Sequence, residues 1–243
     1  MYDKEMFERA ATSPFLQFCD SDIIDGEMRA GFEHNVKVII VEPYQIERLL
    51  EIAKEYPNSR TRIGMCNGYP FGAYRTNTKV MLTKFAVEHG VHEMAVGINI
   101  NAVLSGDIET AKKDLAAVVE ATEGKVEVIP VSWAVRVPFE TLDQICEMYI
   151  DLGITTMKTS AGLHYGAMQV EHVQYIQRKF GDKLAIEVAG RCRTRETAEA
   201  MRAAGAVCFH MSQWRRICGN GYDYQFDYLT KKGGYMTYRD RDQ

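Results

Sequence analysis

The feature that most constrains the fold is a regular alternation of short apolar runs and amphipathic stretches along most of the chain. The runs are rich in β-branched residues and apolar nearly throughout, which is typical of parallel strands buried on both faces. They predict strands at 15–19, 36–41, 62–66, 93–99, 126–131, 155–159, 184–188 and 207–211. The stretches between them have the helical period and predict helices at 45–56, 76–89, 108–121, 139–152, 170–180 and 195–204, with a shorter one at 25–33.

This alternation predicts an α/β protein. Eight strand–helix units in one chain of 243 residues favour a closed (β/α)8 barrel, the TIM barrel, built as a single domain. An open, doubly wound sheet is the alternative, and it also binds ligands at the carboxyl ends of its strands. We expect the barrel at 1–218 and a Gly- and Tyr-rich tail at 219–243 that covers the barrel or forms an oligomer contact.

Charge and composition narrow the classes of partner. A net charge of −4 argues against binding to nucleic acid or to an anionic membrane surface. Since the chain lacks a long apolar run and a signal-like start, a cytoplasmic protein is expected, and a homo-oligomer is also expected. The six cysteines and six histidines show no metal-binding spacing, so we expect reduced thiols, no metal and no cofactor.

Lys158 is the most informative candidate for chemistry. It ends the predicted strand at 155–159, next to Thr159 and Ser160. In a barrel, functional residues gather where strands end. Burial there lowers the pKa of an amine from about 10.4 and makes it a nucleophile toward carbonyl groups. The alternative is a lysine that leaves the strand end for water.

Other polar residues end neighbouring strands. They are Asn67, Glu187, Gly190, Arg191, His210 and Ser212. One amine, one carboxylate and several anion-binding groups indicate acid–base or covalent carbonyl chemistry on a small anionic substrate.

Several segments resemble the deoxyribose-phosphate aldolases, class I aldolases of the (β/α)8 fold. The loop 68–72 is similar to that family's G-F-P-x-G segment and is followed by Thr78-Lys79. Lys158-Thr159-Ser160-Ala161-Gly162 resembles its K-T-S-T-G, whose lysine forms the Schiff base. The residues around Gly190 and Arg193-Thr194 follow the pattern of its phosphate site. The resemblance runs from about residue 36 to 214 and implies a Schiff base on Lys158.

Departures from the family pattern are concentrated at the strand ends. Ala95 stands where the family has the aspartate of its proton relay, and Glu187 stands where it has a second lysine. The family's paired glycines become Gly190-Arg191, and His210 replaces a glycine of its last phosphate loop. The resemblance therefore implies a changed site on a retained scaffold.

Glu187 leaves two interpretations open. At ~4 Å and an effective dielectric of ~20, a carboxylate attracts an ammonium by about 4 kcal/mol, which raises the pKa of the lysine. Either Arg191 or Arg193 neutralises Glu187, so that Lys158 is the nucleophile and Glu187 the general acid–base. Or Lys158 and Glu187 form an ion pair, and the chemistry is proton transfer without an imine.

We therefore expect a class I (Schiff-base) aldolase-type lyase that acts on a small sugar phosphate or related hydroxy-carbonyl compound. Lys158 and Glu187 are the expected catalytic residues. The expected substrate-binding residues are Thr159, Ser160, Gly190, Arg191, His210, Ser212 and Asn67. One alternative is a metal-independent isomerase, epimerase or non-covalent lyase with Glu187 as base. Another is a catalytically silent sugar-phosphate-binding barrel.

Overall fold

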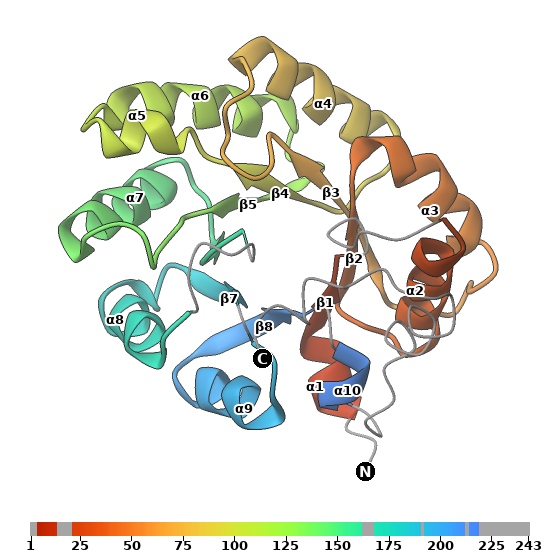
Figure 1. Ribbon diagram of the computed structural model, residues 1–243. Helices are drawn as coiled ribbons and strands as arrows, with labels where there is room; N and C mark the ends of the chain where they lie inside the picture. The colour runs from red at the N-terminus through yellow and green to blue at the C-terminus, as the bar shows by residue number, and fades with distance from the viewer. Residues whose placement is uncertain (1–3, 14–20, 162–167, 191, 212–213, 219–243) are drawn as a thin grey trace, which may run out of the picture.

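The computed structural model describes residues 4–13, 21–161, 168–190, 192–211 and 214–218. Eight parallel strands close into a barrel in chain order, with β1 hydrogen-bonded to both β2 and β8 (Figure 1). The strands are β1 (Ala10–Thr12), β2 (Val38–Val41), β3 (Arg62–Asn67), β4 (Glu93–Gly97), β5 (Glu127–Val131), β6 (Thr156–Lys158), β7 (Ala185–Ala189) and β8 (Ala206–His210). The predicted (β/α)8 barrel is thus confirmed.

Helices surround the barrel (Figure 1). They are α1 (Lys4–Arg9), α2 (Ser21–Glu33), α3 (Ile46–Ala53), α4 (Thr76–Glu88), α5 (Ile100–Leu104), α6 (Ile108–Ala121), α7 (Phe139–Asp151), α8 (Val170–Phe180), α9 (Arg195–Ala203) and α10 (Trp214–Cys218), with the 3-10 helix η2 (Pro43–Gln45). The helices predicted from 45 onward lie within a few residues of the observed ones, because each has a clear apolar face. The short helices α1, α5 and α10 were not predicted.

The position of the first strand differs from the prediction. Sequence periodicity placed it at 15–19, but β1 is Ala10–Thr12, and residues 14–20 lie outside the described part of the chain. Ala11 pairs with Val38 of β2 and with His210 of β8, so these three residues close the barrel. The small side chains of β1 contribute little to a hydrophobic pattern. The pattern therefore predicts a strand at the larger apolar residues that follow.

The interior of the barrel is lined by small side chains in its middle layer. Ala11, Cys66, Ala95 and Cys208 form an apolar cluster with Val38 and Ile40. Small residues leave room for the long polar side chains of Lys158 and Glu187, which are also buried. The described cysteines are free and buried, as predicted for packing residues. Within the described ranges, no helix is both long and apolar enough to cross a membrane.

The loop 68–72 is held tightly against the end of β4. The Gly72 amide donates to the Gly68 carbonyl at 2.7 Å, and Gly72 has a φ of +65°. A Cβ atom on Gly72 would lie only 2.0 Å from the carbonyl oxygen of Ile98. Glycine is therefore required twice at this position, by the backbone conformation and by the close approach of another backbone segment.

We expect Gly72→Ala to lower the free energy of unfolding by about 3 kcal/mol, because it adds left-handed strain to a backbone clash. Gly106→Ala is the matched control: Gly106 has a φ of +79°, and a Cβ there would meet no atom within 4 Å. It should lose only about 1 kcal/mol. Urea unfolding of both variants measures the difference, and equal losses would show that the loop does not need this contact.

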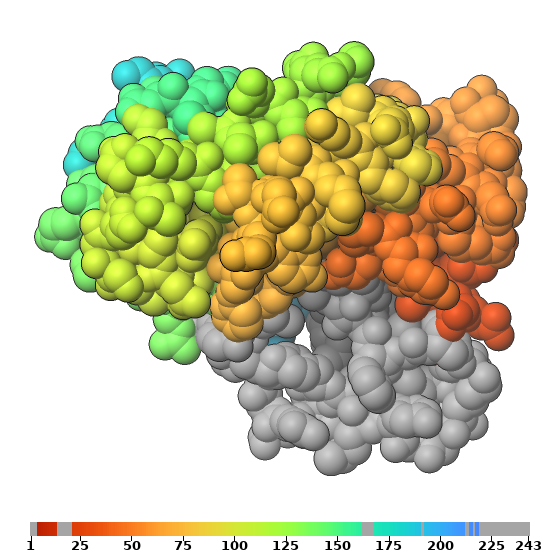
Figure 2. All heavy atoms as spheres, turned by 90° about the horizontal axis from the view of Figure 1, so that it is seen from above, coloured from red at the N-terminus to blue at the C-terminus, as the bar shows by residue number. Residues whose placement is uncertain are grey.

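Helices α4 and α6 are joined by a buried ion pair. The amine of Lys79 contacts Asp114 at 2.6 Å and donates to the carbonyl of Gly97 at 2.8 Å. Thr76 donates to the other oxygen of Asp114 at 2.7 Å. The two helices lie side by side on the outside of the barrel (Figure 1), and their atoms form neighbouring yellow and yellow-green parts of the face in Figure 2. Since Gly97 ends β4, this pair fixes the outer layer against the strand that supports the 68–72 loop.

Candidate active site

Lys158 ends β6 and its side chain lies inside the barrel. The residue is 1% exposed. Its amine lies 5.9 Å from the centroid of the Tyr69 ring, whose hydroxyl donates to the carbonyl of Ala161. Among the described residues, no carboxylate lies within 4.0 Å of the amine. A solvated lysine at the strand end, the alternative interpretation, is therefore wrong.

Glu187 is paired with two other residues, one at each oxygen. The Lys37 amine donates to Oε1, and Nε2 of His210 lies 2.7 Å from Oε2. Lys158 and Glu187 are paired Cα positions of β6 and β7, yet the two side chains form no ion pair. The second interpretation, an ion pair between them, is therefore not what the structure contains. Lys37 was not among the predicted site residues.

Burial and neighbouring charge set the protonation of this group. Burial lowers the pKa of the Lys158 amine, and this outweighs the opposing effects of Cys66 and Glu187. Burial would raise the pKa of Glu187, but contacts with His210 and Lys37 outweigh it and hold the pKa low. Burial and the Lys158 charge lower the pKa of His210 to about 4. At neutral pH the pair is thus a carboxylate and a neutral imidazole.

Further charged residues lie at the first positions of β3, β4 and β5. Arg62 contacts Glu93 at 3.1 Å and Glu127 at 2.7 Å. Burial and the Glu187 charge raise the pKa of Glu93. Burial lowers the pKa of Lys37, but Cys208, Glu187 and Glu93 together outweigh burial and raise it. The carboxylate of Glu187 is therefore neutralised by Lys37 on the side away from His210.

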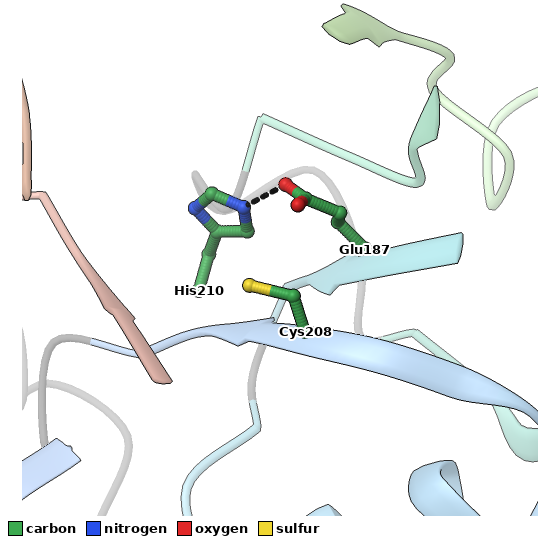
Figure 3. A group of neighbouring side chains, drawn as sticks. All are labelled: Glu187, Cys208 and His210. Atoms are coloured by element: carbon green, nitrogen blue, oxygen red, sulfur yellow. Dashed lines mark hydrogen bonds and ion pairs between the residues drawn. The ribbon is translucent and has the colours of Figure 1, made fainter. Parts of the chain in front are cut away.

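Cys208 lies beside the Glu187–His210 pair (Figure 3). One ligand-type atom from each of the three residues lies within 4.8 Å of the others. The 2.7 Å contact between His210 and Glu187 is a hydrogen-bond distance, and the Lys37 ammonium bonds the same carboxylate. A divalent cation here would be repelled by that ammonium, so the arrangement fits a hydrogen-bonded array better than a metal centre. The expectation of no metal stays a prediction.

The other predicted site residues have different surroundings. The Thr159 hydroxyl accepts from the Ala189 amide at 3.1 Å and so joins the ends of β6 and β7. Ser160 is buried beside it. Gly190 follows β7 with a φ of +107°, and its carbonyl accepts from the Met168 amide. These residues gather around the end of β6, where Lys158 lies.

Three of the predicted site residues are not found in the group around Lys158. The amide nitrogen of Asn67 donates to the Lys79 carbonyl and to the Thr83 hydroxyl, so it is engaged by helix α4. The structure therefore does not bring the Asn67 side chain together with Lys158. Arg191 and Ser212 lie outside the described residues, as does the tail at 219–243.

Comparison with known proteins identifies the family. No protein-family model matches the sequence. The curated deoxyribose-phosphate aldolase of Clostridium novyi is 34% identical over 155 residues, 64% of this chain and 70% of the relative. That of Brevibacillus brevis is 30% identical over 185 residues, 76% of this chain and 82% of the relative. The chain belongs to the deoxyribose-phosphate aldolase family.

Family membership confirms the predicted resemblance and the predicted class, an aldolase-type lyase. The fold agrees with solved structures. The deoxyribose phosphate aldolase of Aeropyrum pernix, described as tetrameric, superposes with a TM-score of 0.80 at 16% identity, over 88% of this chain and 90% of that one. An aldolase named QR15 gives a TM-score of 0.79 at 22% identity, over 96% of this chain and all of that one.

Within this aldolase family, the departures at Ala95, Glu187 and His210 are buried side chains of the barrel strands. Ala95 is 1% exposed and belongs to the apolar interior cluster, so it offers no proton-transfer group. Glu187 is fully buried and holds His210, another departure. The site thus combines the family's lysine position with a carboxylate–imidazole pair.

Proposed function

We propose that the protein is a class I aldolase in which Lys158 forms an imine with a carbonyl substrate. The observation that carries the proposal is a fully buried amine at the end of β6 with a lowered pKa and no carboxylate partner within 4.0 Å among the described residues. A lowered pKa increases the fraction of free amine at neutral pH, and the free amine is the nucleophile. The imine then withdraws electrons from the bond that breaks.

The proposed substrate is a small hydroxy-aldehyde that carries an anionic group, with a deoxyribose phosphate as the first choice because of the family. Gly190, together with Arg191 and Ser212, is the proposed anion-binding set, and the buried Thr159 and Ser160, which follow Lys158 in the chain, are proposed to contact the substrate hydroxyls. A retro-aldol assay comparing a phosphorylated deoxyribose with the free sugar tests this choice. We expect kcat/KM to be at least 100-fold higher for the phosphorylated sugar, and equal values would reject the anion-binding assignment.

Lys37 is proposed to keep Glu187 from raising the pKa of Lys158. In Lys37→Met, the Glu187 carboxylate loses its counter-charge and favours the protonated form of Lys158. The pKa of Lys158 should then rise by about one unit, so that borohydride trapping of an imine is about tenfold slower at pH 7. The pH midpoint of the trapping rate measures this shift.

Lys112→Met is the control for Lys37→Met, since Lys112 pairs with Asp151 on the surface. It should leave the midpoint unchanged. A midpoint that stays constant in Lys37→Met as well, in protein with the native circular dichroism spectrum, would show that Lys37 does not shield Lys158.

We also propose a cytoplasmic homo-oligomer in which residues 219–243 cover the barrel or contact a second subunit. The Aeropyrum pernix relative is described as tetrameric. Light scattering of the full chain measures the mass in solution, and a monomer at micromolar concentration would reject the oligomer.

A further inference from the structure

His210 presents a buried polar atom that the described part of the chain leaves without a hydrogen bond. Its side chain is only 4% exposed. Nε2 contacts Glu187, whereas Nδ1 is buried and has no hydrogen-bond partner within the described residues. Figure 3 shows Nδ1 on the side of the ring that faces away from Glu187. A buried polar atom without a partner destabilises the fold by about 1–3 kcal/mol, and at the strand end that it shares with Lys158 a bound substrate or a water molecule can supply the partner.

The contacts of the ring determine which nitrogen carries the hydrogen. Glu187 is ionised, so it accepts a hydrogen bond, and Nε2 of His210 must donate it. In a neutral imidazole, the other nitrogen then has a free lone pair. Lys37 bonds the second oxygen of Glu187, which fixes the carboxylate and therefore the ring. Nδ1 is thus a base held in a defined orientation.

His210 and Lys158 share one end of the barrel. His210 is the last residue of β8 and Lys158 the last residue of β6, and β7 lies between them. Glu187 pairs with Lys158 on one side, and Ala189 pairs with His210 on the other. The two strand ends therefore place an amine and a free imidazole nitrogen on the same interior face. The relay position on β4 is Ala95, which has no titratable group.

We propose that His210 is the proton-transfer residue of the aldol reaction, with Nδ1 acting on the substrate and Glu187 and Lys37 as positioning residues. This inference rests on the proposed imine at Lys158. In the cleavage direction, Nδ1 takes the hydroxyl proton of the imine-bound substrate. The oxygen electrons form the carbonyl of the released aldehyde, and the electrons of the broken C–C bond move into the imine and give an enamine.

The same proton completes the cycle. The imidazolium is stabilised by the Glu187 carboxylate at Nε2, and its Nδ1–H protonates the enamine carbon. The imine is restored and water hydrolyses it, releasing the second product and the Lys158 amine. His210 returns to the neutral form, so that no proton is gained or lost in the whole step.

The enamine step can be measured without knowing the substrate. Acetaldehyde is the smallest aldehyde with exchangeable hydrogens next to its carbonyl group. In D2O, imine formation on Lys158 followed by reversible proton removal replaces its methyl hydrogens by deuterium, which NMR detects. Borohydride trapping of the same sample reports imine formation alone. The two readouts separate the role of His210 from that of Lys158.

His210→Gln is the test variant, because its amide can still donate to Glu187 but has no basic nitrogen. We expect trapping on Lys158 to persist and deuterium exchange to fall by about 100-fold or more. His172→Gln is the matched control, since Nδ1 of His172 is also buried and has no partner among the described residues, but His172 lies on α8 against Phe139. His172→Gln should retain both borohydride trapping on Lys158 and deuterium exchange at the wild-type rate.

Exchange in His210→Gln within threefold of the wild-type rate, with trapping intact, would overturn the role of His210 while leaving the imine in place. If borohydride trapped no adduct on Lys158 in the wild-type protein, the proposed function on which this role depends would itself be overturned.

Discussion

Lys158→Met should abolish catalysis and make the protein more stable. The substitution removes the only proposed nucleophile, so kcat/KM for aldol cleavage should fall by about 10⁴-fold or more. Methionine has a similar length and no charge to bury, so the free energy of unfolding should rise by about 1–2 kcal/mol at pH 7. Cleavage kinetics and urea unfolding on the same preparation measure both effects.

The stability that Lys158→Met gains over the wild type should decrease as the pH rises. Because the pKa of Lys158 is lower in the folded than in the unfolded protein, the unfolded chain binds more protons between the two values. The stability of the wild type therefore rises with pH through this window, up to about pH 10.4. This contribution is absent from Lys158→Met, so the two stability curves should approach each other as the pH rises.

Lys79→Met is the control for a buried lysine with a structural role. Lys79 is also fully buried, but it pairs with Asp114. Its removal leaves a buried carboxylate without its cation and should lower the free energy of unfolding by about 3 kcal/mol. Opposite signs for the two variants would support a functional Lys158, whereas a similar loss of stability in both would contradict it.

Glu187→Gln should stop proton transfer without preventing imine formation. Glutamine is nearly isosteric, and its carbonyl oxygen can still accept from Lys37. Its amide nitrogen would face Nε2 of His210 as a donor, which forces the imidazole hydrogen onto Nδ1. The base is then lost, and we expect deuterium exchange into acetaldehyde to fall by 10²–10³-fold, as for other wrong-tautomer substitutions. Trapping on Lys158 should remain.

Glu127→Gln provides the comparison for Glu187→Gln. Glu127 is a half-buried carboxylate at the start of β5 that bonds Arg62 and Thr156 rather than His210. Glu127→Gln should exchange deuterium into acetaldehyde at the wild-type rate. Because a wrong tautomer is not corrected by pH, exchange in Glu187→Gln should also stay low when the pH is raised to 9. Recovery at high pH would argue that Glu187 acts only through the pKa of its neighbours.

The fold could be predicted because its elements carry strong local signals. The runs that became β2 to β8 are apolar and β-branched, and helices α6 and α8 begin and end where their periodicity does. Strand β1 could not be predicted, since Ala10–Thr12 is short and small, and its place depends on pairing with β2 and β8. Hydrogen bonds to distant strands leave no periodic pattern nearby.

The part of the site that a sequence motif marks could be predicted, and Lys158 is the example. Lys158 ends β6 and Glu187 lies in the middle of β7, and the parallel register of the two strands pairs them. The contact between Lys37 and Glu187 joins residues 150 positions apart and could not be read from spacing. One signal was present, a lysine directly before the apolar strand β2. Asn67 shows the converse, because a polar residue at a strand end can serve the adjacent helix instead.

Reductive trapping detects the imine on Lys158 that the proposed function requires. The full chain is incubated with short aldehydes and with a phosphorylated deoxyribose, treated with borohydride, and mapped by peptide mass spectrometry. We expect one adduct, on Lys158, that is absent from Lys158→Met. An adduct on another lysine, or no adduct from folded protein that cleaves the sugar phosphate, would contradict the claim.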